Sequence, residues 1–209
     1  MECVRKGKGL TPEQEQLMVD NNVPEWYIDS CKKIKYMFPK AHAVAYVMMA
    51  FRIAYYKVHY PVEYYCTYFS VRADEFDAGM MIGRENVAKS LKELGEIEKP
   101  SQKEKNLITI LEICREMYAR GIEFSNIDLY KSDAKRFLPD NGKIRPPFSA
   151  LPGLGGAAAQ SIMDARTDGE FFSIKEFSDR THVSKSVIAL MKEFGCLGDL
   201  PETDQVTFF

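Results

Sequence analysis

The segment that most constrains the fold is a short glycine hairpin that leads directly into an alanine-rich stretch. It reads Leu151-Pro152-Gly153-Leu154-Gly155-Gly156, and it continues as Ala157-Ala158-Ala159-Gln160-Ser161-Ile162-Met163. Glycine adopts backbone angles that other residues avoid, so Gly153 and Gly155 allow a tight turn. The first amides of the helix that follows then point outward, where they can bind an anion. The segment therefore predicts one hairpin of a helix-hairpin-helix fold.

The surroundings of this hairpin favour phosphate as its ligand. No acidic residue lies between positions 151 and 163, so no side chain of the segment competes for the amides. Helix-hairpin-helix modules hold a nucleic-acid phosphate in this way without reading bases. The alternative is a helix start that uses glycine only as a turn. The preceding Leu-Pro and the immediate run of small residues favour DNA binding, by Gly153, Leu154, Gly155 and Gly156.

Composition and charge fit a globular protein with one or two domains. The 209 residues are 45% apolar and 28% charged, which allows a sizeable core. A net charge of -2 excludes a polycation that binds nucleic acid over its whole surface. The charge is uneven, however, because residues 31–60 hold six basic residues and no acidic one. A local field of one sign attracts an anionic partner more than the total charge does.

The sequence carries no sign of a catalytic or metal centre. Five scattered cysteines without a Cys-x-x-Cys pair, and three separated histidines, predict neither a disulfide framework nor a metal site. Walker loops, His-Glu-x-x-His and Gly-x-Ser-x-Gly are absent, so we predict no catalytic residue. We expect a cytoplasmic location without a signal peptide. Arg52 and Lys57 argue against a membrane span over residues 41–60, so no membrane partner is expected.

Helical patterns dominate the chain, which predicts a mainly α fold. Helices are expected over residues 11–21, 24–34, 40–60, 61 onward, 83–94 and 101–120, two of them with capping boxes at Thr11 and Ser101. The 40–60 helix is apolar on all sides, which predicts a central, buried helix. Residues 122–149 lose the helical period. Alternation at 127–130 and the turn signal Asp140-Asn141-Gly142 predict a small β-hairpin there.

Lys40 and His42 lie in the first turn of the expected 40–60 helix. Positive charge at a helix start opposes the helix dipole. An anion bound between these side chains and the first amides would reverse that penalty. The alternative is that Lys40 extends to water and His42 makes an ordinary hydrogen bond. Spacing alone slightly favours the second interpretation.

Two short helices near the C-terminus predict a second helix-hairpin-helix unit. They are expected over residues 173–180 and 184–194, and Gly195 ends the second. Val183, Ser184 and Lys185 stand where glycines would be expected. This hairpin is therefore either a weaker phosphate site, with Lys185 as a DNA-binding residue, or a unit that only packs against the first hairpin and binds no phosphate.

A longer pattern resembles a known family. The segment Phe38-Pro39-Lys40-Ala41-His42-Ala43-x-Ala45-Tyr46, continued by Arg52-Ile53-Ala54-Tyr55-Tyr56-Lys57-Val58-His59-Tyr60-Pro61, strongly resembles the fingers of C-family bacterial replicative DNA polymerases, most of all the PolC type of DNA polymerase III alpha subunit. Residues 5–13 also resemble those fingers. Residues 151–166 and 173–195 resemble the family's tandem helix-hairpin-helix duplex-binding domain. The resemblance covers essentially the whole chain.

The resemblance implies three parts and their partners. Residues 1–100 would be a C-terminal portion of the fingers, 101–200 a duplex DNA-binding domain, and 201–209 a flexible tail. In the fingers, residues matching the family's basic positions would bind the triphosphate of the incoming dNTP or a nearby template phosphate: Arg5, Lys6, Lys8, Lys40 and His42. In the tail, four residues match a peptide that binds the sliding clamp, although phenylalanine replaces the usual leucine at 208: Gln205, Val206, Phe208 and Phe209.

The resemblance also bears on activity. The family's metal-binding carboxylates belong to the palm, which precedes the fingers and is not in this chain. The chain is thus expected to bind no cofactor itself, with Mg²⁺ held by the palm, and to be inactive alone. Two rival classes remain: a free-standing helix-hairpin-helix DNA-binding accessory module, and a helical scaffold that binds only proteins. Salt-dependent DNA binding separates the scaffold from the other two.

Overall fold

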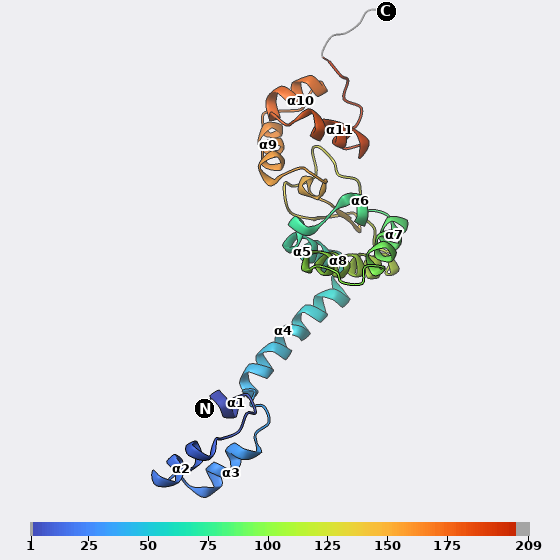
Figure 1. Cartoon of the computed structure of the whole chain (residues 1–209). Coiled ribbons are helices and arrows are strands. Elements are labelled where there is room, and N and C mark those ends of the chain that lie inside the picture. Colours follow the sequence, from blue (N-terminus) through green and yellow to red (C-terminus); the bar gives the residue numbers. More distant parts are fainter. Residues whose placement is uncertain (1, 204–209) are drawn as a thin grey trace, which may run out of the picture. The chain divides into compact units, whose positions relative to one another are not determined.

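The structure, a computed structural model, describes residues 2–203 and is mainly α-helical, as predicted (Figure 1). Within these residues, eleven α-helices accompany one two-stranded sheet. The chain divides into two compact units, Met1–Tyr55 and Tyr56–Phe209. Over the same described range, none of the helices has both the length and the hydrophobicity needed to cross a bilayer.

The first unit holds α1 (Glu2–Arg5), α2 (Pro12–Asp20), α3 (Glu25–Lys33) and most of α4 (Lys40–His59). The capping box predicted for α2 is present: the Gln14 amide donates to Thr11 Oγ1 at 3.2 Å, and the Thr11 amide donates to Gln14 Oε1 at 3.1 Å. The α2 and α3 helices contact each other. The unit's small core is made of Val4, Ile28 and Cys31.

The expectation that the 40–60 helix is buried is wrong. No residue of α4 is buried, and large apolar side chains project into solvent, with Tyr46 exposed by 65% and Phe51 by 73%. The helix is apolar on all sides, but α1, α2 and α3 leave it uncovered. An apolar pattern indicates a surface that excludes water in the working protein, and the covering surface need not belong to the same chain. Exposed apolar surface of this extent marks an interaction site.

The second unit begins with four helices around an aromatic core: α5 (Pro61–Val71), α6 (Ala78–Met81), α7 (Arg84–Gly95) and α8 (Gln102–Ala119). Phe69 of α5 is fully buried, and its ring centroid lies 5.4 to 5.5 Å from those of Phe76, Phe124 and Phe137. Such ring pairs add stability beyond their buried area. Leu111 and Met117 of α8 belong to the same core.

This core spans the predicted boundary at residue 100. The α5 helix lies before that boundary and α8 after it, yet both contribute to one cluster. The compact units therefore differ from the predicted ranges 1–100 and 101–200. The physical reason is that α5 contributes buried residues such as Tyr65 to a core that residues 102–119 complete. The functional meaning of the two ranges stays a prediction.

The predicted β-hairpin is formed by β1 (Leu138–Asp140) and β2 (Lys143–Arg145). Its turn residues Asn141 and Gly142 have φ of 49° and 81°, the positive values that a two-residue hairpin turn requires. The strand expected over 127–130 is wrong. Asp128 Oδ1 accepts hydrogen bonds from the amides of Tyr130 and Lys131, both at 2.9 Å, and these bonds hold a turn instead.

Three helices end the described chain: α9 (Gly156–Thr167), α10 (Ile174–Thr181) and α11 (Lys185–Glu193), drawn in orange to red in Figure 1. The α10 helix contacts both α9 and α11. Ile162, Phe177 and Met191, one from each helix, are fully buried. The hairpins that precede α9 and α11 are therefore mounted on one shared core.

Candidate nucleic-acid interface

The first hairpin is a tight turn fixed by two buried leucines. The Leu154 amide donates to the Leu151 carbonyl at 3.1 Å. Gly153 has φ of 80°, which with Pro152 before it makes a type II turn. Leu151 and Leu154 are buried, whereas Gly153 and Gly155 between and beside them are exposed. The leucines anchor the turn and leave its glycine backbone at the surface.

The start of α9 offers amides that nothing in its own cap uses. Gly155 is the N-cap residue and has no side chain to accept a hydrogen bond, and the first turn holds no acidic residue. The first main-chain bond of the helix runs from the Ala159 amide to the Gly155 carbonyl at 3.0 Å. A Cβ atom built on Gly155 or Gly156 would meet nothing within 4 Å. A phosphate oxygen can therefore approach these amides closely.

The second hairpin repeats the backbone of the first, one residue earlier than predicted. His182 has φ of 53° and takes the left-handed place of Gly153. Val183 is buried like Leu154, and Ser184 is the N-cap of α11 with ψ of 155°, close to the 157° of Gly155. The glycine positions therefore correspond to 182 and 184, not to 183–185. Lys185 then occupies the place of Gly156, at the first position of α11.

The two hairpins differ in chemistry. Ser184 Oγ accepts from the Val187 amide at 3.4 Å and lies 2.8 Å from Ser186 Oγ, so the chain itself caps α11. Fewer bare amides are left than at α9. In exchange, Lys185 is exposed at the helix start and supplies a positive charge. The second hairpin is thus a weaker amide site with a cation beside it.

The first unit brings the two predicted basic segments together. Gly7 has φ of 73°, and a Cβ atom there would lie 1.5 Å from the Lys35 carbonyl oxygen, so only glycine fits. The Met37 amide donates to the Arg5 carbonyl at 3.0 Å. Residues 5–7 therefore lie against residues 35–37, directly before α4 begins at Lys40. Sequence spacing gave no sign of this contact.

The basic side chains near these two segments differ in whether an acidic residue already pairs with them. Arg5 and Lys6 contact Glu2 Oε1 at 2.8 and 3.0 Å. The hydrogen bond from Arg5, followed by that from Lys6, lowers the pKa of Glu2 to about 2. These pairs are exposed, so an anion can exchange for Glu2 at little cost. Lys8 and Lys40 are exposed as well.

The comparisons with known proteins agree with this geometry. A family profile described as "Helix-hairpin-helix motif" matches residues 121–206, a range that includes both hairpins. The chain is also similar to "DNA polymerase III PolC-type" of Listeria monocytogenes (54% identical), Bacillus subtilis (52%) and Thermotoga maritima (51%). Each match covers all of this chain and 15% of the relative.

The chain belongs to the PolC-type DNA polymerase III family. It spans about 15% of the length of the curated relatives that it matches. The resemblance of the chain to the PolC type is thereby confirmed.

The PolC-type chain also carries an aromatic series that sequence reasoning did not assign to the site. The His42 ring lies between Phe38 and Tyr46, with centroids 5.0 and 4.6 Å away, and Phe38 stacks on Tyr36 at 6.4 Å. Two aromatic rings therefore flank the imidazole at the start of α4. The spacing of residues 38, 42 and 46 is helical and could have revealed the series.

The clamp-binding residues predicted in the PolC-type tail lie outside the described residues: Gln205, Val206, Phe208 and Phe209. The segment before them is firmly held. The Ile174 and Lys175 amides donate to the carbonyls of Pro201 (2.8 Å) and Glu202 (3.2 Å). Lys192 Nζ contacts the Glu202 carboxylate at 2.6 Å. In the part of the chain that the structure describes, no group of three or more His, Cys, Asp or Glu could hold a metal ion.

Proposed function

We propose that this chain is the part of a bacterial replicative DNA polymerase that holds the primer–template duplex by its phosphates. The observation that carries the proposal is the pair of hairpins with matching backbone, at residues 153–155 and 182–184, on one helical core. The helix-hairpin-helix match and the PolC-type relatives support it.

The chemistry of the hairpins suits phosphate and not bases. Main-chain amides at a helix start donate to phosphate oxygens, and such contacts carry no sequence information. The amides of Gly155 and Gly156 serve one phosphate. At the second hairpin, Lys185 neutralises a phosphate that fewer amides hold. Binding is therefore independent of sequence and weakens with salt.

Duplex binding should fall linearly with salt on a logarithmic scale, with a slope of about -0.9 per phosphate neutralised. Gly153→Ala combined with Gly155→Ala should weaken binding equally on unrelated sequences, because a methyl group then stands where the phosphate approaches. Alanine at Gly153 also costs about 1 kcal/mol of stability, since φ there is 80°. The measurement is fluorescence anisotropy of labelled duplexes over a salt series.

Gly142→Ala is the matched control for this double variant. Gly142 has φ of 81° and open space around its Cβ position, so alanine there brings the same backbone strain in the β-hairpin turn. The control should lose stability and keep duplex affinity. A folded double variant that binds duplex as tightly as the parent would defeat the hairpin assignment.

For the first unit we propose contacts between the fingers and the incoming dNTP. Lys8, Lys40 and His42 are exposed, and the contact of residues 5–7 with 35–37 supports their convergence. Arg5 and Lys6 also contact the triphosphate when a phosphate oxygen replaces Glu2 as their ion-pair partner. In the complete polymerase these cations would stabilise charge on the triphosphate, while palm carboxylates outside this chain hold Mg²⁺.

Lys40→Ala in the complete polymerase should lower kcat/KM for nucleotide incorporation by at least roughly tenfold, about 1.4 kcal/mol of transition-state stabilisation. Duplex affinity should change little, because Lys40 is assigned to the triphosphate. Lys33→Ala is the control, since Lys33 is also an exposed lysine of this unit and lies at the end of α3. Steady-state kinetics that do not change in the Lys40 variant would favour a lysine that only extends to water.

The exposed surface of α4 favours a polymerase part over a free-standing accessory module. A protein that works alone rarely leaves a 20-residue apolar helix without a buried residue. In a larger polymerase that surface has further polypeptide to cover it. The sliding clamp is the remaining partner that we propose, through the tail.

A further inference from the structure

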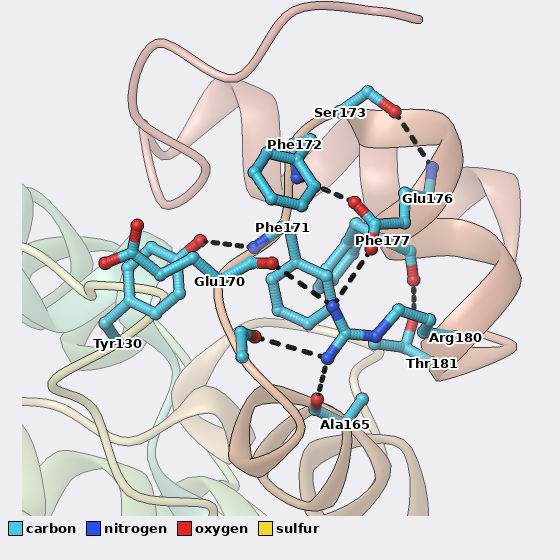
Figure 2. Close-up of polar contacts among 11 residues, drawn as sticks. Tyr130, Ala165, Glu170, Phe171, Phe172, Ser173, Glu176, Phe177, Arg180 and Thr181 are labelled. Carbon is cyan, nitrogen blue, oxygen red and sulfur yellow. Dashed lines mark hydrogen bonds and ion pairs between the residues drawn. The ribbon is translucent and has the colours of Figure 1, made fainter. Parts of the chain in front are cut away.

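Arg180, near the end of α10, binds the last turn of α9 and the loop that follows it through three main-chain carbonyls (Figure 2). Its Nη2 donates to the carbonyls of Ala165 and, at 3.2 Å, Gly169, and its Nη1 donates to the carbonyl of Glu170 at 3.3 Å. Ala165 belongs to the last turns of α9. One side chain of α10 therefore holds both the end of α9 and the loop that leaves it.

Two further contacts fix the guanidinium itself (Figure 2). Nη1 donates to Glu176 Oε1 at 3.1 Å, and the guanidinium carbon lies 4.3 Å from the centroid of the Phe171 ring. Glu176 also accepts from the Phe172 amide at 2.7 Å through its other oxygen. The Phe171 ring is buried and packs edge-on against Phe177 at 5.1 Å. The planar fork of arginine is needed for this set of bonds, and lysine cannot reproduce it.

A further hydrogen bond joins α9 and α10 next to the second hairpin. Ser161 Oγ of α9 donates to the Thr181 carbonyl at 2.7 Å. Thr181 directly follows Arg180 and directly precedes His182, the left-handed residue of the second hairpin. On the other side, Ser161 lies five residues from Gly156, where α9 leaves the first hairpin. The two hairpins are thus connected by a short path of helix and side-chain hydrogen bonds.

We propose that Arg180 is a positioning residue that fixes the second hairpin relative to the first, so that both hold phosphates of one duplex at the same time. The inference rests on the proposed duplex binding. Arg180 is not assigned to the DNA, because its guanidinium is already engaged by the loop carbonyls and Glu176. Two weak sites held at a fixed separation bind far more tightly than either alone, because the second contact becomes intramolecular.

The test compares Arg180→Lys with the parent in duplex affinity and in salt dependence. The lysine keeps the charge but loses the fork, so the affinity should fall by about tenfold or more through a lower effective concentration of the second hairpin. Arg72→Lys is the matched control, because Arg72 also pairs with a glutamate (Glu75) and lies over a ring (Tyr68), outside the hairpin helices. The control should bind duplex like the parent.

The decisive comparison repeats the substitution in a chain whose first hairpin is disabled by Gly155→Asp. With one hairpin left, its position relative to the other no longer matters, so Arg180→Lys should have no effect on affinity in this background. A loss as large as in the intact chain would overturn the proposal, since it would mean that the substitution damages the second hairpin itself. An intact chain whose affinity does not change would overturn it as well.

A distance measurement tests the positioning without DNA. Spin labels on cysteines at Gln160 of α9 and Glu193 of α11, both exposed, report the separation of the two hairpin helices once the exposed Cys3 is replaced by serine. Arg180→Lys should broaden the distance distribution, and Ser161→Ala should do so to a smaller extent. Equal distributions in all three chains would refute the positioning role. A parent chain that keeps a narrow distribution but binds no duplex would instead refute the proposed function alone.

Should Arg180→Lys fail to fold, which a thermal melt would reveal, Ser161→Ala carries the same tests. It removes only the hydroxyl that donates to Thr181 and leaves the Phe171 and Phe177 packing in place. Its affinity loss should again vanish in the Gly155→Asp background. Persistence of that loss would count against the proposal.

Discussion

Gly155→Asp should make the chain more stable and should remove most of its affinity for duplex DNA. Gly155 is the N-cap of α9, with φ of -70° and ψ of 157°, an extended conformation that aspartate adopts without strain. Aspartate is among the preferred N-cap residues, and its charge suits the positive end of the helix dipole. Together with the lower entropy of a non-glycine unfolded chain, the gain is about 1 kcal/mol.

The same carboxylate would occupy the amides that we assign to the phosphate. Like charges brought together at an interface cost several kcal/mol, so duplex affinity should fall by at least about a hundredfold. Stability and binding then move in opposite directions, which a general loss of structure cannot produce. Thermal melts and anisotropy titrations on the same preparations give both quantities.

Gly155→Asn is the control for this charge effect. Asparagine caps a helix about as well as aspartate but carries no charge. It should give a similar stability and a smaller loss of duplex affinity, because its side chain occupies the same amides without the repulsion of a negative charge. If the aspartate variant binds duplex as tightly as the asparagine variant, the anion site lies elsewhere.

The features that the sequence predicted correctly are those decided by neighbouring residues. The capping box of Thr11 and Gln14 depends on a spacing of three, and the β-turn at Asn141 and Gly142 on two positive φ values. The turn at Gly153 likewise follows from proline and glycine at adjacent positions. Each is a local choice of backbone angles, so the sequence alone suffices.

Features that depend on distant residues were not predictable in this way. Burial of α4 requires a covering surface, and the first unit provides none for side chains such as Phe51. The fit of Gly7 against the Lys35 carbonyl joins segments almost thirty residues apart. The register of the second hairpin was missed because His182, a residue that rarely takes positive φ, ends α10 where glycine would be the usual signal.

Removing residues 205–209 should abolish binding of the sliding clamp and leave duplex binding unchanged. Duplex binding should not change because the contacts that hold the start of the tail lie before residue 205. Pro201 and Glu202 are bonded to the start of α10, and Glu202 pairs with Lys192 of α11. The truncation therefore keeps every described contact between the tail and the helices that carry the second hairpin.

The expected loss of clamp binding rests on the resemblance of Gln205, Val206, Phe208 and Phe209 to a clamp-binding peptide, in which phenylalanine replaces the usual leucine at 208. A peptide that becomes ordered on binding loses entropy, so we expect a dissociation constant on the order of micromolar, about -8 kcal/mol. Burying one phenylalanine contributes roughly 2 kcal/mol, so Phe208→Ala with Phe209→Ala should weaken clamp binding about a thousandfold. Binding that weak gives no measurable heat, so the double variant should behave like the truncated chain. Thr207→Ala, at the spacer position, should bind the clamp like the parent. Calorimetry with the cognate clamp measures all four chains, and equal heats from the intact and truncated chains would rule out a clamp-binding role for the tail.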